Sequence, residues 1–429
     1  MLEKLFGLKA ASTTIRTEIL AGMSTFLTMS FIIAVNPMFL ADAGIPFEAG
    51  FVATIIATTV GTAIMAFWAK WPVAVAPGMG LNAYFAYGLV LGQQFSWQQA
   101  LTAVFVASSL FFLFSLSKAR SWLIGAIPTS MQVGITAGIG LFLAMIGLQS
   151  MGLVAADPDT IVRLGTVHAP ELLLALAGLV LMAGLQARGI NGSILISIMI
   201  LSIIGWVSGL AEFGGIVSTS IPTASAAFQL DFSVLTTFSF LSVVFVLFFL
   251  DFFDTTGTLT AIADLTGKRK DDGSIENLDR AVLADTGASI VGSLVGTSSM
   301  TTYMESATGI KAGGRTGLTA LVVAVLFVFC LFLQPLFASI PAFATAPALV
   351  FVAAAFLQPL RNIDWDDAVV GIPVLLTTLI MPLTFSIAAG IAIGFLSYIA
   401  IHIIAGRMQN LNAGIIIIGL FGAVWLLAA

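Results

Sequence analysis

Charged residues are scarce in this sequence: only 9% of its 429 residues are Asp, Glu, Lys or Arg. Soluble domains contain about 25% charged residues. Hydrophobic residues make up 59% of the chain, and the mean hydropathy is +1.09. A soluble globular fold is therefore excluded, and the composition predicts an all-α polytopic membrane protein.

Cysteine and histidine are also nearly absent. Cys330 is the only cysteine, which excludes a disulfide framework and a metal site built on cysteine. His168 and His402 lie far apart in the sequence, which argues against a metal centre built on histidine. The chain has no basic run of the kind that binds nucleic acid. We therefore expect neither a metal, nor an organic cofactor, nor a nucleic-acid partner.

The few Lys and Arg residues predict how the chain crosses the membrane, because these residues concentrate in cytoplasmic loops. Long stretches without them are bounded by Lys or Arg at both ends; these are 17–69, 71–117, 189–267, 281–310, 316–360 and 362–406. Each is expected to cross outward and back, and 121–187, which contains only Arg163, forms a further pair. The spacing predicts about 14 spans in the cell membrane, with the N-terminus in the cytoplasm.

The two ends of the chain lie outside this count. Residues 1–16 are expected to form a cytoplasmic amphipathic lead-in, since no signal-peptide cleavage site precedes the next apolar run. The apolar run 411–427, within the terminal segment 407–429, is compatible with a fifteenth span or with a helix on the membrane surface.

One of the paired stretches, 281–310, is too short for two helical spans, which together need about 40 residues. An extended chain covers about 3.3 Å per residue against 1.5 Å in a helix. The sequence "VGTSSMTTY", residues 295–303, is rich in small and β-branched residues, and it predicts a strand before a helix. The sequence "WPVAVAPGMGLNAYFAYG", residues 71–88, shows the same pattern about half a chain earlier.

These two broken segments indicate an inverted repeat of seven plus seven spans. Because seven predicted spans precede residue 215, the second half begins on the opposite side of the membrane. Discontinuous spans at matching positions of inverted halves mark the binding site of many transporters.

Four acidic residues fall inside the predicted spans: Asp251, Asp254, Asp285 and Glu305. A charge at the bilayer centre costs roughly 3 kcal/mol, so these side chains must face a cavity or a partner. Asp251 and Asp254 are three residues apart and share one helix face. Asp251 is equally compatible with a structural hydrogen bond, Asp285 with a place near the cytoplasmic interface, and Asn82 with a helix cap.

Four stretches carry a family resemblance: "APGMGLNAYFA", "FFDTTGTL", "ADTGASIVGSLVGTSSMTTYMESATG" and "GGRTGLTA". Together they resemble the purine permeases of the nucleobase–cation symporter-2 (nucleobase–ascorbate transporter) group, in its hypoxanthine/guanine/adenine branch. The resemblance covers residues 15–425. It implies short antiparallel strands in spans 3 and 10, proton symport, an elevator-like motion and a possible homodimer through the gate domain. The implied segments are 17–118 and 236–338 for the core, 119–210 and 339–406 for the gate, and 211–235 for the outer connection.

The resemblance also implies roles for particular residues. Asp254 falls at the substrate-binding acid of span 8, and Glu305 at the carboxylate of span 10. Asn82 matches the asparagine of span 3, Asp251 the second acid of span 8, and Asp285 the acid of span 9. Thr258 stands where other members have a histidine. Together with the neighbouring residues of the broken spans, the expected substrate site is Asp254, Glu305, Asn82, Gly80, Leu81, Met304 and Thr258. The candidates for proton coupling are Asp251, Asp254, Asp285 and Glu305.

The sequence thus predicts a transporter rather than an enzyme, with hypoxanthine and guanine as substrates and adenine as a weaker one. The 6-oxopurines present N1–H to an ionised carboxylate, whereas adenine presents a lone pair there. Alternatives are a transporter of the same fold for another nucleobase, such as an adenine-selective, xanthine or uracil permease, or for an anion. An intramembrane aspartyl protease would need a Gly-x-Gly-Asp stretch, which does not occur. A membrane scaffold would leave the buried acids unexplained.

Overall fold

The computed structural model describes residues 2–117, 127–218, 222–270 and 274–428. Its elements in the first half are α1 (Leu2–Phe6), α2 (Ile15–Met29), α3 (Ile32–Asp42), α4 (Phe47–Ile64), the π-helical η1 (Met65–Ala69), β1 (Val75–Pro77), α5 (Met79–Ala83), the π-helical η2 (Tyr84–Gly92), α6 (Trp97–Ser115), α8 (Thr129–Ser150), β2 (Val154–Asp157), β3 (Ile161–Leu164), α9 (Pro170–Ala187) and α10 (Ser193–Val207). The second half contains α11 (Phe238–Thr266), α12 (Leu278–Val295), β4 (Met300–Thr302), α13 (Ser306–Lys311), α14 (Gly317–Cys330), η3 (Leu331–Leu333), α15 (Gln334–Ala338), α16 (Ala342–Leu357), η4 (Gln358–Asn362), α17 (Ala368–Thr384), α18 (Ile387–Ile404), η5 (Met408–Asn410) and α19 (Ala413–Ala428).

Some predicted boundaries cannot be compared with this description. The boundary at residues 118 and 119 lies outside the described residues, and so do residues 219–221 of the predicted connection 211–235 and the final residue of the segment 407–429.

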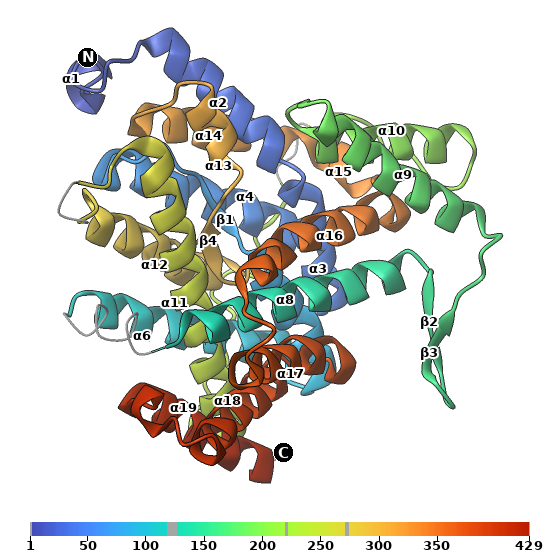
Figure 1. Cartoon of the computed structure of the whole chain (residues 1–429). Coiled ribbons are helices and arrows are strands. Elements are labelled where there is room, and N and C mark those ends of the chain that lie inside the picture. Colours follow the sequence, from blue (N-terminus) through green and yellow to red (C-terminus); the bar gives the residue numbers. More distant parts are fainter. Residues whose placement is uncertain (1, 118–126, 219–221, 271–273, 429) are drawn as a thin grey trace.

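The helices confirm the predicted class of all-α polytopic membrane protein. Nine helical stretches of the described residues, some of which join consecutive elements such as α2 and α3, are at least 18 residues long and apolar enough to cross a membrane. Shorter apolar helices cover Ser193–Val207, Ala368–Thr384 and Ala413–Leu427. The count of fourteen spans stays a prediction, because the broken spans and the shorter helices do not reach this length. The apolar run 411–427 forms α19, which packs against α18 (Figure 1).

Both predicted strands are present, and they pair with each other. β1 and β4 form an antiparallel two-stranded sheet in which Ala76 faces Thr301 at the centre. All six strand residues are buried. Backbone outside a helix is tolerated at membrane depth only where protein surrounds it or where it lines a cavity. The strands meet this condition, because they lie in the middle of the molecule between helices of both halves (Figure 1).

One side-chain hydroxyl group of the preceding span forms two hydrogen bonds with the backbone of each strand. Thr62 on α4 donates a hydrogen bond to the carbonyl of Val75 and accepts one from its N–H, both at 3.0 Å. Ser289 on α12 makes the same two bonds with Met300, both at 2.9 Å. These ties occupy matching positions in the two halves, which agrees with the predicted inverted repeat.

The turn between α12 and β4 requires glycine. Gly296 has a φ of 101°, a left-handed conformation that side chains with a Cβ rarely adopt. A Cβ at this position would also lie 2.5 Å from the Cβ of Ala226. The glycine therefore allows the connection before α11 to approach the start of the broken span.

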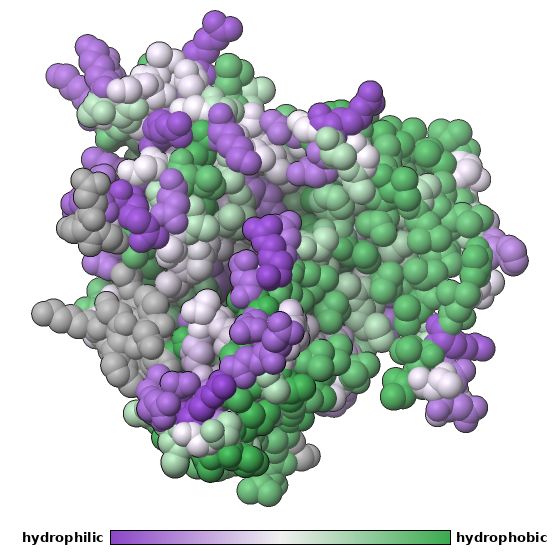
Figure 2. Space-filling model, viewed as in Figure 1, coloured by the Kyte–Doolittle hydropathy of each residue, from purple (hydrophilic) through white to green (hydrophobic). Residues whose placement is uncertain are grey.

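The helices pack as two groups (Figure 1). In the first group, α12 packs against α4 and α6, α14 packs against α2 and α4, and α11 packs against α6. In the second group, α8 packs against α16 and α17, and α18 lies between α17 and α19. Figure 2 shows hydrophobic residues spread over the side of the molecule formed by α9 and α10, as expected for a surface that faces lipid.

A buried acid, Glu18 on α2, joins the first span to the start of α14. Its carboxylate accepts hydrogen bonds from the N–H and the hydroxyl of Thr319, at 3.2 and 2.6 Å, and from the hydroxyl of Thr316 at 2.9 Å. It also accepts one from the N–H of Arg315 at 2.9 Å. The carboxylate thereby accepts hydrogen bonds from N–H groups at the N-terminal end of α14, and its charge suits the positive end of the helix dipole.

We expect Glu18→Gln to destabilise the protein, because an amide of the same shape loses the charge and turns an N–H₂ group toward donors. Hydrogen bonds to charged groups contribute about 1.5–3 kcal/mol each. The midpoint of thermal unfolding in detergent should fall by several degrees. Glu3→Gln, at an exposed acid of α1, is the control and should leave the midpoint unchanged. A Glu18→Gln protein as stable as the wild type would show that this cap is dispensable.

Candidate functional site

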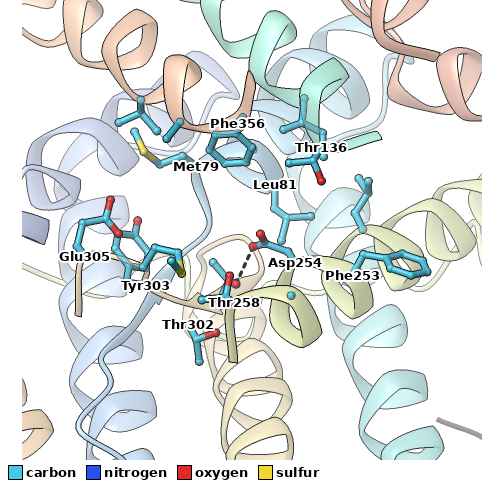
Figure 3. A pocket seen from close by; sticks show the side chains of 18 of the residues that line it. Met79, Leu81, Thr136, Phe253, Asp254, Thr258, Thr302, Tyr303, Glu305 and Phe356 are labelled. Atoms are coloured by element: carbon cyan, nitrogen blue, oxygen red, sulfur yellow. Dashed lines mark hydrogen bonds between the residues drawn. The ribbon is translucent and has the colours of Figure 1, made fainter. Parts of the chain in front are cut away.

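A cavity of about 360 Å³ opens where the broken spans meet the second helix group. Its volume falls within the range of small-molecule sites. The first group lines it with α5, with α11, and with the segment from Thr301 to Glu305. The second group lines it with α8, α16 and η4. Figure 3 shows side chains from both groups entering the same space.

Asp254, on α11, is one of two carboxylates that line the cavity. It is half-buried and accepts a hydrogen bond of 2.7 Å from the hydroxyl of Thr301 on β4 (Figure 3). The bond joins the middle of α11 to the centre of the two-stranded sheet. A carboxylate has several acceptor sites, so Asp254 keeps acceptor capacity for a ligand.

Glu305 is the second carboxylate of the cavity, and it stands where the chain passes from β4 into α13. Its backbone carbonyl accepts a hydrogen bond from the Thr308 hydroxyl at 2.7 Å, which fixes this turn. The side chain is half-buried. Glu305 and Asp254 thus approach the space from two different elements (Figure 3).

Most of the predicted substrate-site residues line this cavity. Gly80 and Leu81 reach it from α5, Thr258 from α11 and Met304 from the turn before α13. Gly80 also marks a close approach between the two helix groups, since a Cβ at this position would lie 2.5 Å from Cγ2 of Ile139 on α8.

Asn82 is not among the residues that line the cavity. It is buried, and its Oδ1 accepts a hydrogen bond from the hydroxyl of Ser298, just before β4. Its Nδ2 has no hydrogen-bond partner among the described residues. A second asparagine, Asn36 on α3, donates to Thr297 at 2.9 Å. The two asparagines therefore hold the extended segment that leads into β4.

Asp251 and Asp285 lie behind the cavity rather than in it. Asp285 is buried, and it accepts a hydrogen bond of 2.5 Å from Thr255. Asp251 is 2% exposed and lies near Asp285 and Thr255, but neither of its oxygens has hydrogen-bonding geometry with a described partner. Helix α11 thus carries one cavity acid, Asp254, and one buried acid, Asp251, whereas Asp285 lies on α12.

Aromatic packing on the opposite side fixes α11 in place. Phe248 and Phe252 of α11 contact Phe111 and Phe114 of α6, with ring centroids 5.5–6.1 Å apart and steep angles between the rings. Edge-to-face pairs of this kind add about 0.5–1.5 kcal/mol each beyond the area they bury. This contact orients the face of α11 that carries the acids toward the broken spans.

Several cavity residues are absent from the expected substrate site. Thr136 and Ile139 come from α8, Phe253 from α11, and Phe356 from α16. Phe253 directly precedes Asp254 within the quoted stretch "FFDTTGTL". The others lie far away in sequence, and a lone hydroxyl or aromatic residue in an apolar helix gives no local signal.

The described lining of the cavity contains no Lys or Arg side chain. Within the part of the chain that the structure describes, no three His, Cys, Asp or Glu residues are grouped so that they could hold a metal ion. The site therefore offers hydrogen-bond acceptors and apolar surface to a ligand, which suits a largely uncharged molecule with N–H donors better than an anion.

Solved structures share this fold at low sequence identity. The transmembrane domain of the cyanobacterial bicarbonate transporter BicA is 20% identical, with a TM-score of 0.67 over 86% of this chain and 96% of that one. The murine anion transporter Slc26a9, in its inward-facing state, is 12% identical, with a TM-score of 0.67 over 92% and 69% of the two chains. These likenesses establish the fold alone.

Sequence relatives cover nearly the whole chain. A putative permease of Methanocaldococcus jannaschii is 43% identical over 96% of this chain and 94% of its own length. The guanine/hypoxanthine permease PbuO of Bacillus subtilis is 40% identical over 96% and 97% of the two chains, and the adenine permease AdeP of Escherichia coli is 38% identical over 98% and 94%. The group described as "Permease family" matches residues 16–428. The resemblance to nucleobase permeases is thereby confirmed, and the chain belongs to the Permease family.

Proposed function

We propose that this protein carries purine nucleobases across the cell membrane in symport with protons. The single observation that carries the proposal is the cavity between the two helix groups, lined by Asp254 and Glu305 and by no described Lys or Arg. Purine nucleobases are planar and uncharged, and their ring and exocyclic N–H groups are donors to carboxylates. The relatives named as adenine and guanine/hypoxanthine permeases support the same substrate class. Binding of radiolabelled hypoxanthine to the purified protein tests the proposal directly.

In this proposal the first helix group is the core domain and the second is the gate domain. The substrate then moves with the core past the gate, as in an elevator. The division of the cavity lining between the two groups supports this motion, as does the close approach of Gly80 to Ile139. A contact of 3.2 Å between the hydroxyl of Thr345 on α16 and the sulfur of Met38 on α3 lies on the same boundary. We further propose a cytoplasmic N-terminus and a homodimer through the gate.

We assign different parts to the predicted site residues. Asp254 and Glu305 accept hydrogen bonds from the substrate, while Gly80, Leu81, Met304 and Thr258 shape the space around it. Asn82 lies outside the cavity lining, so its part is to hold Ser298 and the strand that follows. Direct donation from its Nδ2 to the substrate would require this segment to move.

Proton coupling is proposed to use Asp251, Asp254, Asp285 and Glu305 as a set, because neighbouring acids titrate together. Thr255, which bonds to Asp285, follows Asp254 directly in α11, and Asp254 is bonded in turn to Thr301. The two bonds thus involve neighbouring residues of α11, one facing the buried Asp285 and one facing the cavity, whereas Asp251 has no hydrogen-bond partner among the described residues. A histidine is replaced by Thr258 here, so the proposed relay runs through carboxyl groups alone.

Asp254→Asn and Glu305→Gln should each abolish nearly all purine uptake, because an amide of the same size loses the charge that accepts the substrate N–H groups. Loss of one charge-assisted bond of about 1.5–3 kcal/mol lowers affinity roughly tenfold to a hundredfold. Asp251→Asn should have a milder effect, since Asp251 does not line the cavity. The measurement is radiolabelled hypoxanthine uptake normalised to membrane expression. Glu212→Gln, at an exposed acid, is the matched control. Wild-type uptake by either cavity variant would remove that residue from the site.

Uptake should be driven by protons. In vesicles with a more acidic outside, initial uptake should accelerate, because the outward-open carboxyl groups load protons there and release them inside. A protonophore should abolish accumulation above equilibrium. Acceleration by a sodium gradient at constant pH, without a response to the protonophore, would overturn proton coupling and leave the purine assignment standing.

Guanine should compete with hypoxanthine uptake more strongly than adenine, xanthine or uracil. Guanine presents N1–H and its 2-amino group side by side to one carboxylate, whereas adenine presents a lone pair at N1. An unpaired buried polar group costs about 1–3 kcal/mol, so the preference over adenine should reach about tenfold to a hundredfold. The chain is similarly identical in sequence to the adenine permease AdeP and to the guanine/hypoxanthine permease PbuO. Sequence identity therefore does not indicate the preferred purine, and the competition experiment does. Stronger competition by adenine or uracil than by guanine would refute the predicted selectivity.

A further inference from the structure

The part of the first helix group that contains the N-terminal residues of the chain carries a cluster of exposed cations beside exposed apolar side chains. We call its cations the cationic collar; they are Lys4, Lys9, Arg16, Lys311 and Arg315, and all are exposed. The acids within residues 1–20 are Glu3, which pairs with Lys9 at 3.3 Å, and the buried Glu18. This positive surface stands out in a chain whose formal net charge is −5.

The fold brings these cations together from segments far apart in sequence. Phe6 and Leu8 are buried against Leu318 at the start of α14, which holds the lead-in on the body of the protein. The segment after α13 lies beside the start of α2, since the N–H of Arg315 bonds to Glu18. α13 itself packs against α2 (Figure 1). The collar is therefore built on fixed elements.

Apolar side chains form a rim next to the collar. Leu2 and Leu5 of α1 are 38% and 43% exposed, although Phe6 of the same short helix is buried. Phe67, whose ring lies 5.7 Å from that of Phe6, and its neighbour Trp68 are 48% and 43% exposed. Figure 2 shows hydrophilic and hydrophobic residues next to each other at this end of the molecule.

The rim continues into the lipid-facing surface of the first span. Exposed residues recur along α2 at helical spacing, at Ile15, Ile19 and Met23. An apolar surface that ends in a belt of Lys, Arg and Trp is the pattern of a segment at the boundary between acyl chains and headgroups. Since the cations exceed the exposed acids there, the headgroups that complement this boundary are anionic.

We propose that the cationic collar and its apolar rim form a binding surface for anionic phospholipid, with headgroups on the collar and acyl chains against Trp68 and the rim. None of the collar or rim residues lines the cavity, and the proposed surface does not depend on which substrate is carried. Because the collar is docked on α2 and α14, the bound lipid belongs to the first helix group.

Trp68 provides the measurement, because it lies in the rim. The full-length protein is reconstituted in phosphatidylcholine vesicles containing a fixed fraction of brominated phosphatidylglycerol or of brominated phosphatidylcholine, with bromine near the headgroup end of the acyl chain. Since the chain has seven Trp residues, the Trp68 signal is the difference between the wild type and Trp68→Phe. Brominated phosphatidylglycerol should quench this signal with an apparent affinity at least about fivefold higher, the effect of one Lys or Arg close to an anionic surface. The preference should shrink in high salt.

The variant Lys4→Gln/Arg16→Gln/Lys311→Gln should lose this preference, while quenching by brominated phosphatidylcholine persists. Arg188→Gln/Lys270→Gln/Arg361→Gln removes the same number of exposed charges elsewhere and should keep it. Size-exclusion profiles confirm that each variant is folded. Equal quenching of wild-type Trp68 by the two lipids, no quenching by either, or equal loss of preference in both triple variants would each overturn the proposal.

Discussion

The hydrogen-bonded pair of short strands at the centre of the molecule is the interaction on which the rest of the structure depends. Breaking two spans leaves backbone N–H and C=O groups inside the membrane, where water cannot satisfy them. Pairing β1 with β4 satisfies groups of both halves at once, and Thr62 and Ser289 satisfy those that remain at the strand ends. The site is therefore built from both halves of the chain, and neither half could form it alone.

This constraint explains the small and hydroxylated residues around the broken spans. A hydroxyl that both donates and accepts replaces the partners that a regular helix would supply to the backbone. Asn36 and Asn82 bond the side-chain hydroxyls of Thr297 and Ser298 in the segment before β4. Bulky aliphatic side chains can neither donate nor accept a hydrogen bond. Thr301 of β4 also donates a hydrogen bond to Asp254. The strand that satisfies backbone groups of the broken spans therefore also orients a cavity carboxylate.

The fold is shared with bicarbonate and anion transporters, so the scaffold alone does not determine the cargo. The chemistry of the cavity does. Asp254 and Glu305 make the described lining rich in acceptors, whereas an anion would require donors or a positive charge. Aromatic residues of α6 pack against the side of α11 that faces away from the cavity. The position of α11 is thus fixed by that contact, and its cavity face remains available for the acids.

The sequence by itself determined the membrane class, the two broken spans and the family, and it singled out six of the residues that line the cavity, because these depend on composition, local chain length and motifs. The short stretch 281–310 required an extended segment, and β4 is that segment. Tertiary structure alone decided which acids reach the cavity: Asp251 and Asp254 share a helix, yet only Asp254 lines the space. It also placed Asn82 behind the lining, brought Thr136 and Phe356 to the site from distant helices, and buried Glu18 as the cap of α14. A sequence pattern assigns a side chain to a helix, but contacts with other helices decide what that side chain meets.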